Sequence, residues 1–286
     1  PRTVAMTAFG ALDISTLKEL PGGRSPITTH VVYAAEQPAH LDRAWQRAVE
    51  EVKAGHQVYV VVPRIASQED KPTDKNQRPA IALEDLAPQL MEGPLKDVRV
   101  GIMHGGLSGA DKDDVMQRFA LGPASPDGID VMVSTTVIEV GVDVPNATMM
   151  IIMDADRFGI SQLHQLRGRV GRGSAPGLCL LVTEAGKFSS SRERLDAVAS
   201  TTDGFKLAEL DLEQRREGDI LGREQSGVRS SLHLVSVLKD DELLEEARIE
   251  AERIIAIDPD LTEHSALERS LQALVNQDRA EYVKKS

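Results

Sequence analysis

Six short runs rich in Val, Ile and Met constrain the fold of this chain more than any other sequence feature. The runs do not alternate polar with apolar residues, and continuous apolar runs are typical of strands covered on both faces of a parallel sheet. Stretches with helical character lie between them, so we expect a doubly wound α/β domain of about 160 residues. The expected strands are Thr29–Ala34, Gln57–Val62, Val98–Met103, Asp130–Ser134, Met149–Met153 and Leu178–Val182. The expected helices are Leu41–Ala54, Leu83–Leu90, Lys112–Ala120 and Ser161–Gly168.

The strand pattern ends after Thr183, and the rest of the chain is expected to be helical or irregular. The further expected parts are a surface loop over Ala66–Pro79, helices over Ser189–Ser200 and Phe205–Gln214, a Gly- and Arg-rich loop or hinge over Arg215–Gly227, and two or three acidic helices from Leu232 onward.

Charge and cysteine content exclude several classes of protein. Lys and Arg number 33 against 45 Asp and Glu, and the formal net charge of −12 taken alone argues against a nucleic-acid partner. The charge is uneven, because residues 157–229 carry 12 basic and 10 acidic side chains, whereas residues 240–286 carry 6 and 13. A local basic track is therefore compatible with nucleic acid.

No apolar run approaches the ~20 residues that span a bilayer. The lone Cys179 excludes a disulfide framework and a Cys-based zinc site, and it fits a reducing cytoplasm.

The most specific segment is Gln162–Gly173, in which three arginines alternate with three glycines. Glycine lets the backbone turn tightly, and arginine offers a rigid fork of donors that suits phosphate. An alternative is a solvated helix end with a glycine cap and arginines near the negative end of the helix dipole. The pattern Gln-x-x-Gly-Arg-x-Gly-Arg resembles motif VI of superfamily-two helicases. The resemblance implies that Arg169 and Arg172 reach the γ-phosphate of ATP held by another lobe, with Gln165 nearby, and stabilise charge in phosphoryl transfer.

A second segment, Val133–Asn146, places Thr135 and Thr136 after a strand and before a short helix. The carboxyl ends of parallel strands are the usual ligand edge of α/β domains, and helix N–H groups and hydroxyls there suit a phosphate. Ordinary helix capping by Ser or Thr is the alternative. The segment is similar to helicase motif V. This resemblance implies that Thr135 and Thr136 contact the nucleic-acid backbone, and that Gly141 and Asp143 face the nucleotide.

Two weaker segments line up with these motifs. Tyr59–Ile65 resembles motif IV, a strand whose following loop faces nucleic acid, which implies a DNA contact for Arg64; without the resemblance it is a buried strand with a Pro stop. His104-Gly105-Gly-Leu-Ser108 follows another strand, and Ser108 is a plausible N-cap. The helicase family uses this turn, here His104 and Gly105, against DNA phosphates. A lone His after a strand is more often structural, and the sequence shows no cluster typical of a metal site.

The segment Phe205–Gly227 resembles the translocation motif shared by the RecG family and the transcription-repair coupling factors. That motif is a helical hairpin and loop that couple ATP-driven lobe movement to movement along duplex DNA. The resemblance implies coupling roles for Arg194, Arg215 and Gln225. The sequence departs from the usual pattern at Arg216, Glu217 and Glu224, and a hairpin used only for packing is the alternative.

The two ends of the chain, Pro1–Ser15 and Leu232–Leu261, also resemble the RecG family. The resemblance implies a RecA-like, P-loop NTPase-type domain. The expected parts are a linker from another helicase lobe over 1–27, the C-terminal RecA-like lobe over 28–185, the hairpin and loop over 186–231, and acidic helices over 232–286. The N-terminus has neither an initiator Met nor a signal-peptide pattern, so we expect a cut inside a longer protein.

The sequence contains no Gly-x-x-x-x-Gly-Lys-Ser/Thr loop, and no Asp-Glu-x-His cluster follows a strand. The resemblance implies that ATP and Mg²⁺ are held mainly by the first lobe of the same protein. It also implies a separate wedge domain at the N-terminus of that protein. We expect the chain alone not to hydrolyse ATP. We expect the full-length protein to bind branched or duplex DNA and to remodel branched DNA, such as replication forks and Holliday junctions, in repair and recombination. Two alternatives are a duplex translocase of the transcription-repair coupling type, which should carry a further regulatory domain, and a non-catalytic interaction module.

Overall fold

The computed structural model describes residues 25–66, 79–139, 144–187, 189–214 and 241–272. The chain divides into two compact units, one of residues 19–211 and one of residues 1–18 with 212–286. The expected loops over Ala66–Pro79 and Arg215–Gly227 and the linker over 1–27 lie almost entirely outside the described residues.

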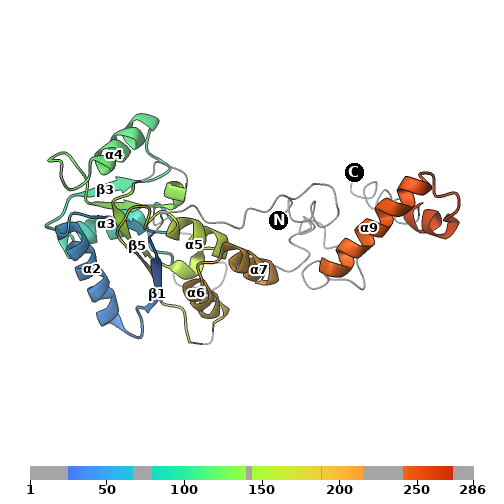
Figure 1. Cartoon of the computed structure of the whole chain (residues 1–286). Helices are drawn as coiled ribbons and strands as arrows, with labels where there is room; N and C mark the ends of the chain where they lie inside the picture. Colours follow the sequence, from blue (N-terminus) through green and yellow to red (C-terminus); the bar gives the residue numbers. More distant parts are fainter. Residues whose placement is uncertain (1–24, 67–78, 140–143, 188, 215–240, 273–286) are drawn as a thin grey trace. The chain divides into compact units, whose positions relative to one another are not determined.

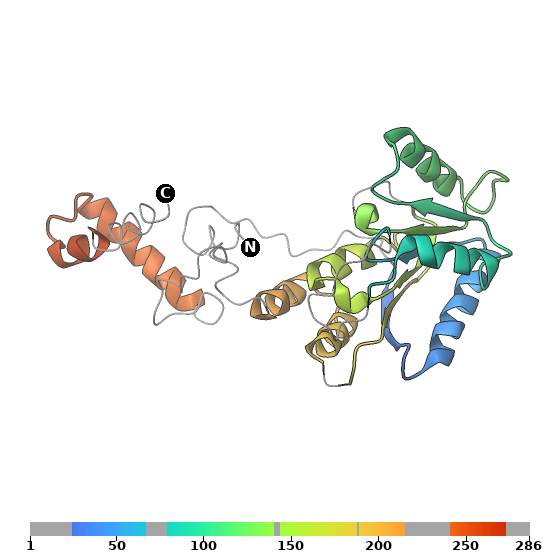
Figure 2. The same cartoon turned by 180° about the vertical axis from the view of Figure 1, so that it is seen from behind.

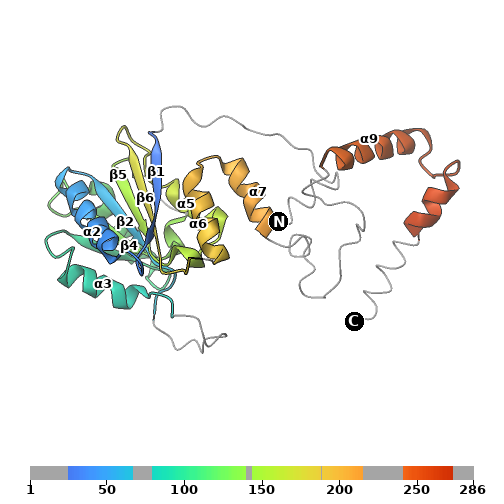
Figure 3. The ribbon, with the colours of Figure 1, turned by 90° about the horizontal axis from the view of Figure 1, so that it is seen from below.

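All six expected strands are present in the larger unit, and their ends differ from the expected ends by at most two residues. They are β1 (Ile27–Tyr33), β2 (Gln57–Val61), β3 (Val100–Met103), β4 (Val131–Ser134), β5 (Ala147–Ile152) and β6 (Gly177–Thr183). Every pairing is parallel, in the order β1-β6-β5-β2-β4-β3 (Figure 3). The expected RecA-like parallel sheet is thereby confirmed.

Helices cover both faces of this sheet (Figures 1 and 3). One face carries α2 (Pro38–Lys53) and α3 (Leu83–Glu92). The other carries α4 (Gly109–Leu121), α5 (Ile160–Arg167), α6 (Ser190–Ser200) and α7 (Gly204–Gln214), the last two seen beside α5 in Figure 2 as well. Because of this cover, β2, β4 and β5 are buried along their whole length. The expectation of burial on both faces is wrong for β1 and β3, which are edge strands with one neighbour and are only partly covered.

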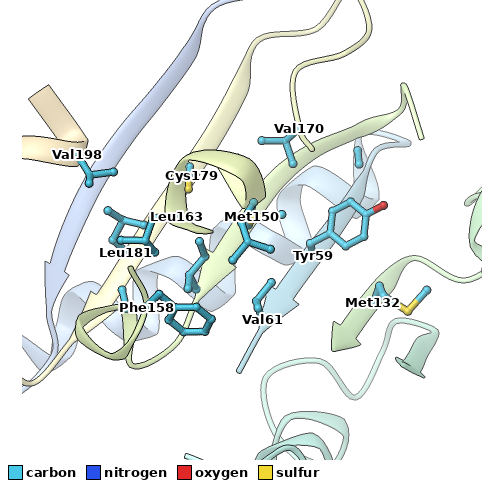
Figure 4. Close-up of a cluster of buried hydrophobic side chains, with 14 of the residues drawn as sticks. Tyr59, Val61, Met132, Met150, Phe158, Leu163, Val170, Cys179, Leu181 and Val198 are labelled. Carbon is cyan, nitrogen blue, oxygen red and sulfur yellow. The ribbon is translucent and has the colours of Figure 1, made fainter. Parts of the chain in front are cut away.

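Two buried clusters hold the layers together, one on each face of the sheet. Along β2, Tyr59 and Val61 belong to one cluster and Val58 and Val60 to the other, as the two-residue period of a strand requires. Figure 4 shows the first cluster, in which Leu163 of α5 packs toward Cys179 and Leu181 of β6. Full burial of each such side chain is worth about 1.5–3 kcal/mol relative to exposure. The packing fixes α5 on the sheet, and with it the segment that follows α5.

The smaller unit contains α9 (Asp241–Ile257) and a second helix that begins at residue 265, so helices are present where the acidic C-terminal helices were expected. The turn between them is organised by Asp258, whose carboxylate accepts the main-chain N–H groups of Thr262 and Glu263 at 2.9 and 2.8 Å. His264 Nδ1 lies 3.0 Å from the same carboxylate. The hydrogen bond from His264 and those from the turn lower the pKa of Asp258 to about 2.

Candidate functional site

Three neighbouring strands end in register at one edge of the sheet. Val61 of β2 pairs with Ser134 of β4, and Ser134 pairs with Met103 of β3. The pairing continues one residue further, because Val62 N donates to Ser134 O at 2.9 Å and Thr135 N to Met103 O at 3.2 Å. The segments that carry the expected DNA-binding residues therefore leave the sheet together. We call the edge of the sheet where β2, β3 and β4 end the carboxyl edge. Its expected DNA-binding residues are Arg64, His104, Gly105, Thr135 and Thr136.

The segments that follow β3 and β4 differ in how far their expected DNA-binding residues are exposed. Thr135 is buried, whereas Thr136 is half-buried and begins the short 3₁₀ turn η1 (Thr136–Glu139). Gly105 is exposed, and its carbonyl accepts Nζ of Lys112 at 3.0 Å. His104 Nδ1 is buried and has no hydrogen-bond partner among the described residues. The accessible groups are thus Thr136 and the turn at Gly105, while Thr135 lies largely beneath them.

The expected N-cap of the following helix is confirmed. Ser108 Oγ accepts the main-chain N–H of Asp111 at 3.2 Å, and Asp111 is the acidic residue in the first turn of α4. This cap fixes the direction in which α4 leaves the turn at His104 and Gly105.

Arg64 is held through its backbone. It forms an isolated parallel bridge with Ala82, and Leu83 N donates to Arg64 O at 3.0 Å. The side chain of Arg64 is half-buried. The chain that returns at residues 79–82 therefore runs beside the segment that carries Arg64.

The arginine and glycine residues that follow α5 lie at the opposite edge of the sheet, where β1, β5 and β6 begin. After α5 crosses the sheet, Gly171 N donates to the carbonyl of Ala147, the first residue of β5, at 3.3 Å. Gly171 has a φ of 68°, and a Cβ there would lie 2.9 Å from Cγ1 of Ile27 and 3.5 Å from Cα of Gly177, at the starts of β1 and β6. The positive φ and the overlap with the Ile27 side chain favour glycine at this turn.

The two expected catalytic arginines, Arg169 and Arg172, are half-buried on this segment. Nε of Arg172 donates to the carbonyl of Gly168 at 2.8 Å. Gly168 itself has right-handed backbone angles, so the left-handed glycine cap of the alternative interpretation does not form there. The hydrogen bond of Arg172 to the end of α5 does agree with that interpretation.

Arg167 differs from the other two arginines, and the expectation that all three offer their forks to phosphate is wrong for it. It is 2% exposed, and Nη1 donates to the carbonyls of Val198 and Thr201 at the end of α6, each at 2.8 Å. Nη2 donates to Nδ1 of His164 at 2.9 Å. Burial lowers the pKa of Arg167, and burial together with the charge of Arg167 lowers that of His164. Burial also raises the pKa of the nearby Cys179 thiol to about 12.

The structure brings the motif V and motif VI segments side by side. η1 contacts α5, and a Cβ on Gly173 would lie 2.5 Å from the carbonyl oxygen of Pro145. Gln165 is exposed on α5. Gly141 and Asp143 lie outside the described residues, as do the expected coupling residues Arg215 and Gln225.

Arg194, the third expected coupling residue, lies on α6 and binds the carboxyl side of the sheet. Its Nη2 donates to the carbonyl of Asp156 at 2.5 Å, in the 3₁₀ turn η2 (Ala155–Arg157). Oδ1 of Asp156 accepts the hydroxyl of Thr183 at the end of β6, at 2.5 Å. Asp154 and Asp156 in this turn were not among the expected functional residues. Their place directly after a buried strand was the signal that could have indicated them.

No group of three or more His, Cys, Asp or Glu side chains that could hold a metal ion occurs in the part of the chain that the structure describes. None of the helices described is both long and apolar enough to cross a bilayer.

The fold and the order of these segments define a class, the C-terminal RecA-like lobe of helicases. The family model "Helicase conserved C-terminal domain" matches residues 41–174, and "ATP-dependent DNA helicase RecG, domain 3, C-terminal" matches residues 201–280. The chain belongs to the RecG family and corresponds to a C-terminal portion of it.

Individual relatives agree with this assignment. The chain is 50% identical over 288 residues to "ATP-dependent DNA helicase RecG" of Mycobacterium leprae (strain TN), across 100% of this chain and 38% of the relative. It is 44% identical over 255 residues to the protein of the same name from Staphylococcus epidermidis (strain ATCC 12228 / FDA PCI 1200), across 89% of this chain and 35% of the relative. The solved "Structure of RecG bound to three-way DNA junction" matches with a TM-score of 0.58 and 34% identity, over 86% of this chain and 29% of that one. The chain thus spans little more than a third of the curated relatives it matches.

Proposed function

We propose that this chain is the C-terminal part of an ATP-dependent DNA helicase that remodels branched DNA, such as replication forks and Holliday junctions, in repair and recombination. One observation carries the proposal. The expected phosphate-binding arginines lie where β1, β5 and β6 begin, and the expected DNA-binding residues lie where β2, β3 and β4 end, so the two sets occupy opposite edges of one parallel sheet, joined by α5 and a continuous core. A lobe of this kind can bind a nucleotide at one end and DNA at the other. The lone buried Cys179 supports a cytoplasmic location for the protein.

ATP with Mg²⁺ supplies the free energy of the motor. The residues present fit one part of a nucleotide site, because Arg169 and Arg172 provide guanidinium groups that suit phosphate oxygens. They do not form a phosphate cradle, and no metal-holding cluster occurs among the described residues. The first lobe and wedge domain of the full-length protein would hold the nucleotide and divide the duplex. On this proposal Arg169 and Arg172 stabilise the charge that develops on the transferred phosphoryl group, and Gly141, Asp143 and Gln165 border it.

At the carboxyl edge, Thr136 and the turn at Gly105 would contact the DNA backbone, with Arg64, His104 and Thr135 beside them. Main-chain N–H groups, hydroxyls and guanidinium groups are the usual partners of phosphate oxygens and carry no sequence preference. This composition suits a protein that moves along duplex or branched DNA of any sequence. Arg194, Arg215 and Gln225 would couple the movement of the lobe to that of the duplex.

The test measures DNA-stimulated ATP hydrolysis by the full-length protein. Arg169→Ala and Arg172→Ala are each expected to slow hydrolysis by about 10³-fold or more, the usual scale for an arginine that contacts the transferred phosphate. Arg43→Ala is the matched control, because Arg43 pairs with Glu50 on the exposed side of α2. Hydrolysis that is unchanged in both variants would remove the two arginines from the catalytic role.

Coupling is tested separately from hydrolysis. Arg215→Ala and Gln225→Ala are expected to leave hydrolysis largely intact while fork unwinding falls, and equal losses of both activities would contradict the coupling role.

The chain of residues 1–286 alone is expected not to hydrolyse ATP. Recovery of hydrolysis when it is mixed with the N-terminal portion of the protein would support a divided motor.

A further inference from the structure

A buried aspartate directly beyond β5 has no role in the site described so far. Asp154 is 1% exposed and has left-handed backbone angles, φ 48° and ψ 46°. For most residues other than glycine this conformation costs about 1–2 kcal/mol, and for Asp and Asn, whose short polar side chains can hydrogen-bond locally, it costs less. Oδ2 of Asp154 accepts the main-chain N–H of Ile81 at 2.7 Å and lies 3.6 Å from Nε of Arg157. A strained backbone persists only where its surroundings fix it, so the direction of this carboxylate is set by the fold.

On one side, Asp154 holds the chain that braces Arg64. Ile81 directly precedes Ala82, which forms the parallel bridge with Arg64. The next residue, Leu83, donates its N–H to the carbonyl of Arg64 at 3.0 Å. The bond from Ile81 to Asp154 therefore fixes a short strand-like segment against the backbone of the expected DNA-binding residue.

On the other side, Asp154 is fixed by η2. The N–H of Arg157 donates to the carbonyl of Asp154 at 2.9 Å. Within the same turn, the carbonyl of Asp156 accepts Nη2 of Arg194 from α6 at 2.5 Å. The turn that aims Asp154 is thus held by the expected coupling residue Arg194.

We propose that Asp154 is a positioning residue, which sets the place of Arg64 at the carboxyl edge and connects it through η2 to Arg194 on α6. The contacts that carry this inference are independent of any ligand. What Arg64 binds rests on the proposed function, and the experiment separates the two.

The first measurement is hydrogen exchange of the Ile81 amide in the full-length protein. Asp154→Gly removes the carboxylate and relieves the left-handed strain, so it leaves the rest of the fold least disturbed. We expect the Ile81 amide to exchange at least about tenfold faster in this variant, because its acceptor is lost. Asp154→Asn keeps an acceptor oxygen and tolerates left-handed angles, so it should restore protection to near the wild-type rate. Asp127→Gly, in the exposed loop before β4, is the matched control and should leave Ile81 unchanged.

The second measurement is the salt dependence of binding to a three-way DNA junction. If Arg64 contacts a phosphate, Arg64→Ala reduces the slope of log affinity against log salt by about 0.9. Asp154→Gly should reduce the slope by a similar amount, and the double variant should show no further reduction. A general loss of stability would not produce this matched change in slope.

Each outcome decides one part of the proposal. An Ile81 amide that exchanges at the wild-type rate in Asp154→Gly would overturn the positioning role. Additive effects of Asp154→Gly and Arg64→Ala on the slope would overturn the route through Arg64. Arg194→Met should also accelerate exchange at Ile81, and no change there would overturn the connection to α6. If Arg64→Ala leaves DNA binding unchanged while Asp154→Gly still accelerates Ile81 exchange, the placement holds and the DNA contact of the proposed function fails.

Discussion

Buried Arg167 and half-buried His164 form a pair on α5, in which Nη2 of the arginine donates to Nδ1 of the imidazole at 2.9 Å. The same guanidinium also closes the end of α6 through the carbonyls of Val198 and Thr201. A residue in the most arginine-rich part of the chain therefore serves the packing of two helices.

This contact predicts that two arginines only two positions apart contribute differently to the free energy of unfolding. Arg167→Ala leaves buried carbonyls and an imidazole without their donor, and should lower the free energy of unfolding by about 3 kcal/mol. Arg169→Ala should change it by less than about 0.5 kcal/mol, as is usual for side chains outside the core. Urea unfolding followed by the fluorescence of the single Trp45 checks both values. Equal losses of stability in the two variants would contradict the assignment.

The lowered pKa of His164 predicts a pH dependence of stability. Burial and the charge of Arg167 lower the pKa of the folded imidazole, whereas in the unfolded chain it titrates near its ordinary value of about 6.5. As the pH falls through that value, the unfolded state takes up a proton more readily than the folded state, so stability decreases. His164→Gln keeps an acceptor without titrating, and should lose less stability than the wild type between about pH 7.5 and pH 5.5. An imidazole that titrates above 6.5 by NMR would show that the direction is wrong.

Cys179 provides a chemical measure of the integrity of the core. Its thiol is fully buried and its pKa is raised to about 12, so almost no thiolate exists near neutral pH. Iodoacetamide should not alkylate the folded chain at pH 8 and should alkylate it completely in urea. Because the chain has one cysteine, mass spectrometry of the product reports this site alone. Alkylation of the folded chain as fast as that of a free thiol would contradict the burial.

Gly171 and Gly55 form a matched pair for substitution. Both have positive φ, 68° and 87°, but a Cβ at Gly55 meets nothing within 4 Å. Gly55→Ala should therefore cost only the backbone strain, about 1–2 kcal/mol. Gly171→Ala adds the overlap with Ile27 and should cost about 1–3 kcal/mol more. Thermal unfolding of the two variants gives the comparison, and equal melting temperatures would exclude close packing at Gly171.

The sequence was sufficient to predict the six strands and their helices because each strand is a compact run of branched apolar residues. It did not predict which strands lie at the edges, since the order β1-β6-β5-β2-β4-β3 depends on packing between distant segments. The difference in burial between Arg167 and Arg169 could be predicted in part from the sequence. Arg167 lies four residues after Leu163, on the apolar stripe of α5, whereas Arg169 follows the end of the helix. The left-handed turn at Asp154 could not be predicted, because the carboxylate is held by the N–H of Ile81, which lies far away in the sequence.

The close packing of Gly171 against the starts of β1 and β6 determines how far the arginine segment can move. A methyl group at Gly171 would overlap the side chain of Ile27, and the N–H of Gly171 donates to the carbonyl of Ala147, so the segment is tied to the starts of β1 and β5. It is therefore part of one rigid body with the six residues of β5, which rise about 20 Å to the opposite edge. A phosphate that pulls on Arg172 by a small amount would therefore not rearrange the segment locally. It would rotate the whole lobe, and over that lever length a rotation of a few degrees displaces the far edge by an ångström or more.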